Sequence, residues 1–168
     1  SGGGISVGTG GSDDFSGGAI GSSWMKYIVG NSRFTQQNGR LIYSADNTSS
    51  LEEYSRLQWK NPMPYNQDWI FQADVNLSDL TMPSPKSLMM AGLNVRNQDD
   101  PDDTALLTLA RERETDGTLI RGFWAEMEVN DNEVVWEDSD TSSINATVRF
   151  RWDASEQKLY YEYDANGA

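Results

Sequence analysis

One short segment, Thr118 to Val129, gathers the residues that could do chemistry. Its apolar and polar residues alternate, which predicts a β-strand whose successive side chains point to opposite faces. One face is apolar and predicts a core, whereas the other carries Trp124, Glu126 and Glu128. An indole beside carboxylates can stack on a sugar ring and accept hydrogen bonds from its hydroxyls. Paired carboxyls can also act as the acid and the nucleophile of a retaining glycosidase, in which they lie about 5–5.5 Å apart.

The composition excludes several other kinds of chemistry. The 168 residues include no His and no Cys, which removes His-assisted nucleophiles, His-ligated zinc, thiol chemistry and disulfides. The formal net charge is −13, from 26 acidic and 13 basic residues. Such a chain repels nucleic acid and anionic lipid, so neither is expected as a partner. No apolar run approaches the ~18 residues of a membrane helix, so membrane insertion is not expected either.

The elements that must position the candidate strand are predicted to be other strands. Alternation recurs along the chain and is broken by turn signals, such as Asn38-Gly39 between two short arms and Asp116-Gly117 before the candidate strand. No segment shows convincing helical periodicity. The fold class predicted is therefore all-β, a two-sheet antiparallel sandwich or jelly roll. The segments expected to form the longer strands are 68–77, 88–97, 104–114, 118–129, 144–152 and 158–163.

The domain organisation predicted is simple. Residues 1–12 are rich in Gly and Ser and are expected to form a flexible linker. Residues 13–168 are expected to form one β-sandwich domain, large enough to bury a proper core. Trp24, Trp69 and Trp152 are in phase with aliphatic residues and are assigned to that core.

Three regions of the chain resemble modules of the concanavalin A-like lectin/glucanase class of bacteria. Asp13–Gly17 followed by Trp24 resembles their opening "DDF-s-G … W", and Gln37–Leu41 is similar to their "nGrL" hairpin. Val148–Asp153 with Lys158–Gly167 resembles their closing hairpin. The resemblance implies a jelly roll, a secreted or cell-surface bacterial protein and glycan binding, although some relatives hydrolyse β-glucans. Relatives usually continue into a further strand, so the end at Ala168 implies an edge that a neighbouring module or another chain could complete.

The binding hypothesis uses the outward side chains of the middle strands. If those strands are neighbours, planar amides, carboxylates and guanidinium groups surround one indole, as in many sugar sites. The alternative is a solvated sheet with cross-strand ion pairs, in a structural or protein-interaction module. The predicted ligand-binding residues are Gln72, Asp74, Asn94, Arg96, Trp124, Glu126, Glu128, Arg149 and Arg151.

The catalytic alternative is a glycoside hydrolase that uses Glu126 with Glu128 or Asp131. Glucanases of the resembling class carry Glu-x-Asp-x-x-Glu, or one residue fewer before the last Glu, on one strand. Here the strand reads Glu126-Met-Glu128-Val-Asn-Asp131, so Glu replaces the middle acid and Asp replaces the last. Both changes alter side-chain length by a methylene and would displace the reactive carboxyls. The sequence therefore favours a binding module without catalysis.

Clustered carboxylates make structural Ca²⁺ the one cofactor that the sequence suggests. Hard oxygen ligands in a loop suit calcium, although the regular spacing of an EF-hand is missing. Modules of the resembling class often hold one such ion. Charge runs are also common as merely solvated turns. The candidate ligands are Asp13, Asp14, Asp99, Asp100, Asp102 and Asp103.

Overall fold

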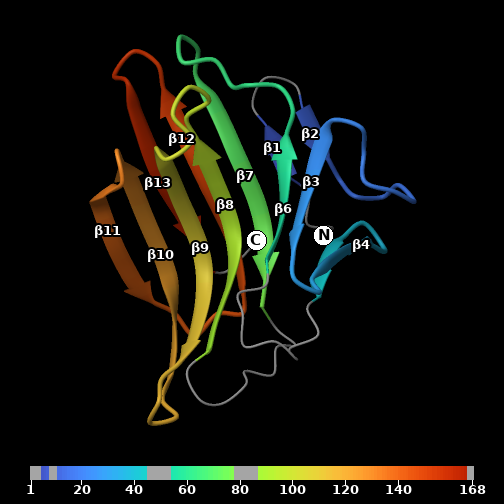
Figure 1. The fold of residues 1–168 in the computed structure, drawn as a ribbon, viewed down its shortest axis with the longest axis vertical. Helices are drawn as coiled ribbons and strands as arrows, with labels where there is room; N and C mark the ends of the chain where they lie inside the picture. The colour runs from blue at the N-terminus through green and yellow to red at the C-terminus, as the bar shows by residue number, and fades with distance from the viewer. Residues whose placement is uncertain (1–4, 8–10, 45–53, 78–86, 166–168) are drawn as a thin grey trace. The chain divides into compact units, whose positions relative to one another are not determined.

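The computed structural model describes residues 5–7, 11–44, 54–77 and 87–165. Antiparallel strands account for its regular structure, and these residues form no helix (Figure 1). Within them there is accordingly no helix that could cross a membrane. The chain divides into two compact units, residues 1–63 and residues 64–168. The all-β class predicted from the sequence is confirmed.

The first unit consists of three short antiparallel pairs, β1 with β2, β3 with β6 and β4 with β5. The β4–β5 turn has the predicted geometry, with Asn38 at φ 54° and Gly39 at φ 68°, as a type I′ turn requires. The β1–β2 pair lies within residues 1–13, where the sequence predicted a flexible linker for residues 1–12. The bounds are β1 Ile5–Val7, β2 Gly11–Asp13, β3 Trp24–Val29, β4 Arg33–Gln36, β5 Leu41–Ser44 and β6 Tyr54–Trp59.

Trp24 organises the packing of this first unit. Its side chain is 5% exposed, its ring meets that of Trp59 edge-on at 4.9 Å, and its Nε1 donates to Asp13 Oδ2 at 2.9 Å. The buried Phe15 lies beside it at 6.5 Å between ring centroids. The expectation that Trp24 is a core residue is therefore confirmed.

The second unit contains the strands that carry the candidate residues. β13, β12 and β7 are neighbours in one sheet, and β11, β10, β9 and β8 form another in that order. All the pairs are antiparallel. The bounds are β7 Trp69–Asn76, β8 Ser87–Arg96, β9 Thr104–Arg113, β10 Leu119–Val129, β11 Asn132–Asp140, β12 Asn145–Asp153 and β13 Lys158–Asp164.

These two sheets pack face to face, an arrangement consistent with a β-sandwich. In Figure 1 the four-stranded sheet lies in front of β12 and β13. Phe123 of β10 stacks on Tyr163 of β13 with ring centroids 4.1 Å apart, and Tyr161 Oη donates to Glu126 O. Desolvation between the sheets raises the pKa of Tyr161 to about 12. The largest fully buried side chains among the described residues are Leu107, Leu109, Val148 and Phe150.

Strand parity follows the sequence prediction, with one exception at a strand end. Ala73 and Leu77 are 6% and 5% exposed, as expected for the apolar face of β7 and the residue just beyond it. Ile144 alternates in phase with Ala146 and Val148, which predicts a core position, but it is 37% exposed, and so that prediction is wrong. It lies one residue before β12 begins, and its carbonyl accepts Leu77 N at 2.9 Å.

β11 is an edge strand within the described part of its sheet. Its pairing with β10 shifts register between Met127 and Glu128, which leaves Val134 without a partner. The turn before it places Asn130 and Asp131 at φ 51° and 58°. Exposed acidic residues run along this strand: Glu133, Glu137, Asp138 and Asp140.

Candidate functional site

The structure divides the predicted ligand-binding residues between two surfaces. Because the inner faces of the two sheets pack together, their outer faces point away from each other. The nine residues therefore do not form the single site that neighbouring strands would have given. One group, on β7 and β12, consists of Gln72, Asp74, Arg149 and Arg151, and the other, on β8 and β10, consists of Asn94, Arg96, Trp124, Glu126 and Glu128.

The side chains of the first group, on the outer face of β13, β12 and β7, form hydrogen bonds and ion pairs within the chain. Arg149 Nε donates to Gln72 Oε1 at 2.8 Å, and Glu162 forms ion pairs with both Arg149 and Arg151 at 3.2 and 2.8 Å. The Arg151 guanidinium also lies 4.0 Å from the centre of the Tyr160 ring. Nearby, Thr147 donates to Asp74 Oδ1 at 2.7 Å. This surface is the cross-strand network that the sequence analysis kept as its alternative.

The outer face of β11, β10, β9 and β8 is different, because aromatic and acidic side chains dominate it. Trp124 lies opposite Asp138 on β11 and Thr108 on β9, and Glu126 lies opposite Trp136 on β11. The rings of Trp124 and Trp136 are 5.7 Å apart and inclined by 53°. Trp136 is 48% exposed and is the more accessible of the two. We call Trp124, Trp136 and Glu126 the tryptophan platform.

Glu126 of the platform is repelled by two neighbouring carboxylates. Burial raises the pKa of Glu126, and the neighbouring charges of Glu128 and Glu133 raise it further. The cation on the same face, Arg96, is held elsewhere, since its Nε and Nη2 donate to Pro101 O at 3.1 and 2.7 Å. Glu126 is therefore a carboxylate without a basic partner among the described residues.

The catalytic alternative is reduced to two residues by this geometry. Glu126 and Glu128 lie on the same face of β10, two positions apart. Asp131 lies beyond the strand, in the left-handed turn before β11. A raised pKa at Glu126 is the property that a general acid needs.

Next to the platform, on the same face of the sheet, β8 packs closely against β9. A Cβ at Gly92 would lie 2.1 Å from Leu107 O and 2.6 Å from the Cα of Thr108, so only glycine fits. Thr108 is 3% exposed, and its Oγ1 is buried without a hydrogen-bond partner among the described residues. A buried hydroxyl without a hydrogen-bond partner costs free energy.

Three residues of this surface were missing from the predicted set. The sequence does not assign Trp136 to a face, because that face depends on a register that shifts at a bulge. Gly92 and Thr108 carried a weak signal, as a glycine inside a strand and a single hydroxyl in the apolar run Ala105–Ala110. Neither reveals its partner strand.

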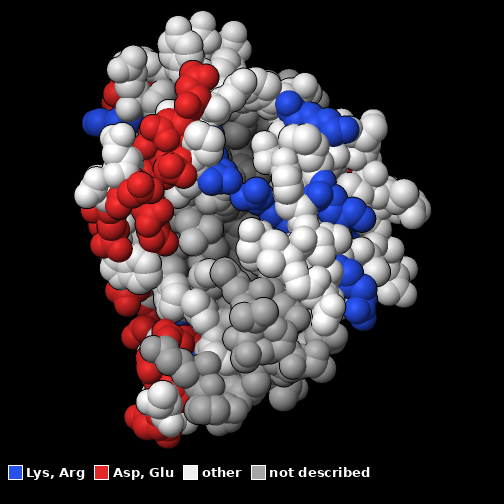
Figure 2. All heavy atoms as spheres, in the orientation of Figure 1, with Lys and Arg blue, Asp and Glu red and all other residues white. Residues whose placement is uncertain are grey.

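Acidic residues extend beyond the platform. Figure 2 shows Asp and Glu side chains gathered over the part of the view in which Figure 1 draws β10 and β11. Carboxylates accept hydrogen bonds from sugar hydroxyls but repel phosphate and sulfate. This face therefore disfavours anionic ligands.

The candidate calcium ligands between residues 99 and 103 include two carboxylates that accept N–H groups. Asp103 Oδ1 accepts from Asn130 N at 2.9 Å and its Oδ2 accepts from the Asn97 side chain at 3.2 Å. Asp100 Oδ1 accepts from Asp102 N, whereas Asp99 and Asp102 are exposed. These carboxylate oxygens accept N–H groups and so stabilise the conformation of the loop.

Asp13 and Asp14 are used in the same way. Asp13 Oδ1 accepts from Phe15 N and Asp14 Oδ1 accepts from Ser16 N, both at 2.9 Å, and the second bond contributes to a lowered pKa of Asp14. Throughout the part of the chain that the structure describes, no three Asp or Glu side chains converge as metal ligands would. Both clusters hold turns.

Comparisons with protein-family models, with curated proteins and with solved structures found no match for this chain.

Proposed function

We propose that this chain is a non-catalytic carbohydrate-binding module whose tryptophan platform binds a neutral glycan. The observation that supports the proposal is the pair of inclined indoles, Trp124 and Trp136, on an outer sheet face that also carries Glu126 without a basic partner. Indole rings stack on the apolar faces of sugars, and the carboxylate accepts hydrogen bonds from their hydroxyls. Among the described residues, Glu126 forms no ion pair and is free to contact a ligand, whereas the charged side chains on the outer face of the other sheet are paired with each other.

The family and the setting belong to the same proposal. We place the module among the concanavalin A-like jelly rolls, on the strength of the motifs in Asp13–Gly17, Gln37–Leu41 and the β12–β13 hairpin. Such a module belongs to a secreted or cell-surface bacterial protein. Its paired sheets and its hairpin turns agree with that assignment.

Binding can be tested with a glycan array followed by calorimetry on the oligosaccharides that bind. Trp136→Ala should weaken binding at least about tenfold, or ~1.4 kcal/mol, because it removes the more accessible ring. Tyr65→Ala is the matched control, since Tyr65 is 78% exposed and lies outside the platform. Equal affinities of the Trp136→Ala variant and the wild type would contradict the proposal.

The second candidate function is glycoside hydrolysis, which the raised pKa of Glu126 beside Glu128 favours. A reducing-sugar assay on the glycans that bind separates the two functions. Release of sugar that is lost in Glu126→Gln would establish the enzyme, whereas binding without release supports the module. A chain that neither binds nor cleaves any glycan would be a structural or protein-interaction module.

A further inference from the structure

Two arginines lie directly opposite each other on the inner face of the four-stranded sheet. Arg111 of β9 pairs with Arg121 of β10, in phase with the buried Leu109 and Phe123. The Arg111 side chain belongs to a residue that is only 7% exposed. A third arginine, Arg113, occupies the next inward position on β9. Like charges directly across a strand pair are destabilising, and more so when they are buried.

No carboxylate neutralises these guanidinium groups within the part of the chain that the structure describes. The ion pairs found there involve Arg149, Arg151 and Lys158 instead. The Nε atoms of Arg113 and Arg121 are buried and have no hydrogen-bond partner among the described residues, and Arg113 Nη1 makes one long contact to Gly117 O at 3.5 Å. Burial lowers the pKa of Arg111, and the charge of Arg121 lowers it further. An uncompensated pair of this kind is unusual in a chain with a net charge of −13.

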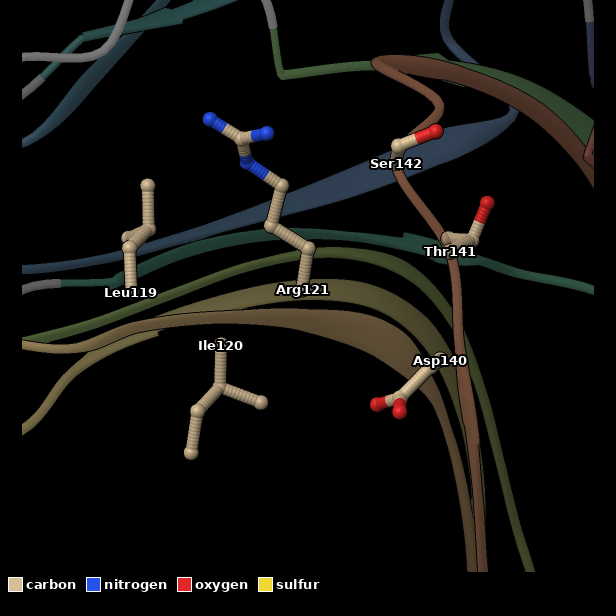
Figure 3. Close-up of a pocket in the computed structure, with 6 residues that line it drawn as sticks. All are labelled: Leu119, Ile120, Arg121, Asp140, Thr141 and Ser142. Atoms are coloured by element: carbon tan, nitrogen blue, oxygen red, sulfur yellow. The ribbon is translucent and has the colours of Figure 1, made fainter.

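Arg121 lines an open surface depression at this end of β10, together with Leu119, Thr141 and Ser142. Figure 3 shows Arg121 and Leu119 projecting to one side of the sheet, with Ile120 and Asp140 on the other. The hydroxyl of Ser142 lies on the side of Arg121. Thr141 N donates to Arg121 O at 3.1 Å, which fixes the segment with these hydroxyls alongside the arginine.

We propose that Arg121, supported by the charge of Arg111 and by the hydroxyls of Thr141 and Ser142, forms a binding site for a small oxyanion. The planar fork of a guanidinium group matches carboxylate, sulfate and phosphate, and hydroxyls add further donors. The ligand is small, because the net charge of the chain and the neighbouring Asp140 repel an extended polyanion. This site is separate from the tryptophan platform, which lies on the opposite face of the same sheet.

The wild-type chain tests the proposal directly. Its melting temperature and its binding by calorimetry are measured with inorganic sulfate, inorganic phosphate, acetate and glucuronate, against chloride at the same ionic strength. We expect at least one of these oxyanions to raise the melting temperature and to bind at one site per chain. A response to acetate and glucuronate alone identifies a carboxylate ligand, and a response to sulfate or phosphate identifies a tetrahedral one. No response to any of the four would overturn the proposal.

Substitutions then locate the site. Arg121→Gln should weaken binding of the responding anion at least about tenfold. Arg96→Gln is the matched control, because it removes the same charge from the exposed, opposite face and should leave affinity within about twofold. Equal weakening by both variants would mean that only net charge matters and would refute the site. If Arg121→Gln does not fold, Arg121→Lys keeps the charge without the fork, and wild-type affinity in that variant would equally refute it.

Discussion

The two outer faces of the second unit differ in how their charges are satisfied. On β12 and β13 each charged side chain has a partner, and Glu162 alone bridges Arg149 and Arg151. On β10 and β11 carboxylates lie beside indoles, and like charges raise the pKa of Glu126. Both faces belong to antiparallel sheets. The two faces therefore differ in whether their charged side chains are paired within the described part of the protein.

Removing the core between the sheets should destroy both faces together. Phe123 is 2% exposed and stacks on Tyr163, so Phe123→Ala should cost about 3–5 kcal/mol of unfolding free energy through lost burial and a cavity. Urea unfolding measures this loss. Tyr163→Ala is the comparison, since Tyr163 is 49% exposed and should cost clearly less. A cost below about 1 kcal/mol for Phe123→Ala would mean that its burial does not hold the sheets together.

A smaller perturbation should damage the platform face alone. Gly92→Ala places a methyl group on the backbone of β9, so we expect a loss of about 1–3 kcal/mol from overpacking and weaker glycan binding. Unfolding curves and calorimetry check the two effects. Gly117→Ala is not a neutral control, because the backbone there has φ 90°, a conformation in which any other residue is strained. Gly18→Ala is suitable, since a Cβ there meets nothing within 4 Å.

The same substitution should act with opposite sign on the two faces. Glu162→Gln removes the partner of two arginines and should cost about 0.5–1 kcal/mol, as expected for a partly exposed network. Glu126→Gln removes a repelled charge and should leave stability at pH 7 unchanged or raise it by a few tenths of a kcal/mol. Unfolding of both variants in parallel measures the contrast. A loss at Glu126 as large as that at Glu162 would contradict it.

Mild acid should reduce the difference in stability between the two faces. The folded pKa of Glu126 is raised above 4.5, so the folded state takes up its proton first and this residue's contribution to stability improves as pH falls toward 4.5. The pKa values of Asp153 and Glu156, at the β12–β13 turn, are lowered from 3.8 and 4.5, so their contributions persist above those values and are lost as the pH falls below them. Stability of Glu126→Gln relative to wild type should therefore decrease as pH falls from 7 to 5.

Calcium should have the smallest effect on either face. The carboxylates of Asp13, Asp14, Asp100 and Asp103 accept N–H groups of their own turns. Melting curves in millimolar calcium and in EDTA should therefore coincide. A rise of about 6 °C or more with calcium would show that these loops rearrange around an ion.

Local sequence signals predicted the elements, and long-range pairing decided the site. Asn38-Gly39 and Asp116-Gly117 gave two hairpins correctly, and alternation gave the faces of β7, β10 and β12. Alternation does not say which strands are neighbours, because residues on one face of a strand look alike whichever sheet receives them. Arg149 and Trp124 therefore had the same outward signal, although β12 pairs with β7 and β10 with β9.

The acidic edge strand β11 has a consequence for how copies of the protein behave in concentrated solution. A second copy that added its own β11 there would bring two rows of carboxylates to within the ~4.8 Å spacing of paired strands. The bulge at Val134 also interrupts the regular row of backbone donors and acceptors that such an addition needs. While Glu133, Glu137, Asp138 and Asp140 are ionised, this edge resists sheet extension between molecules. Acidification and high salt remove that protection, so the colloidal stability of the protein depends on the ionisation of a few side chains on one strand.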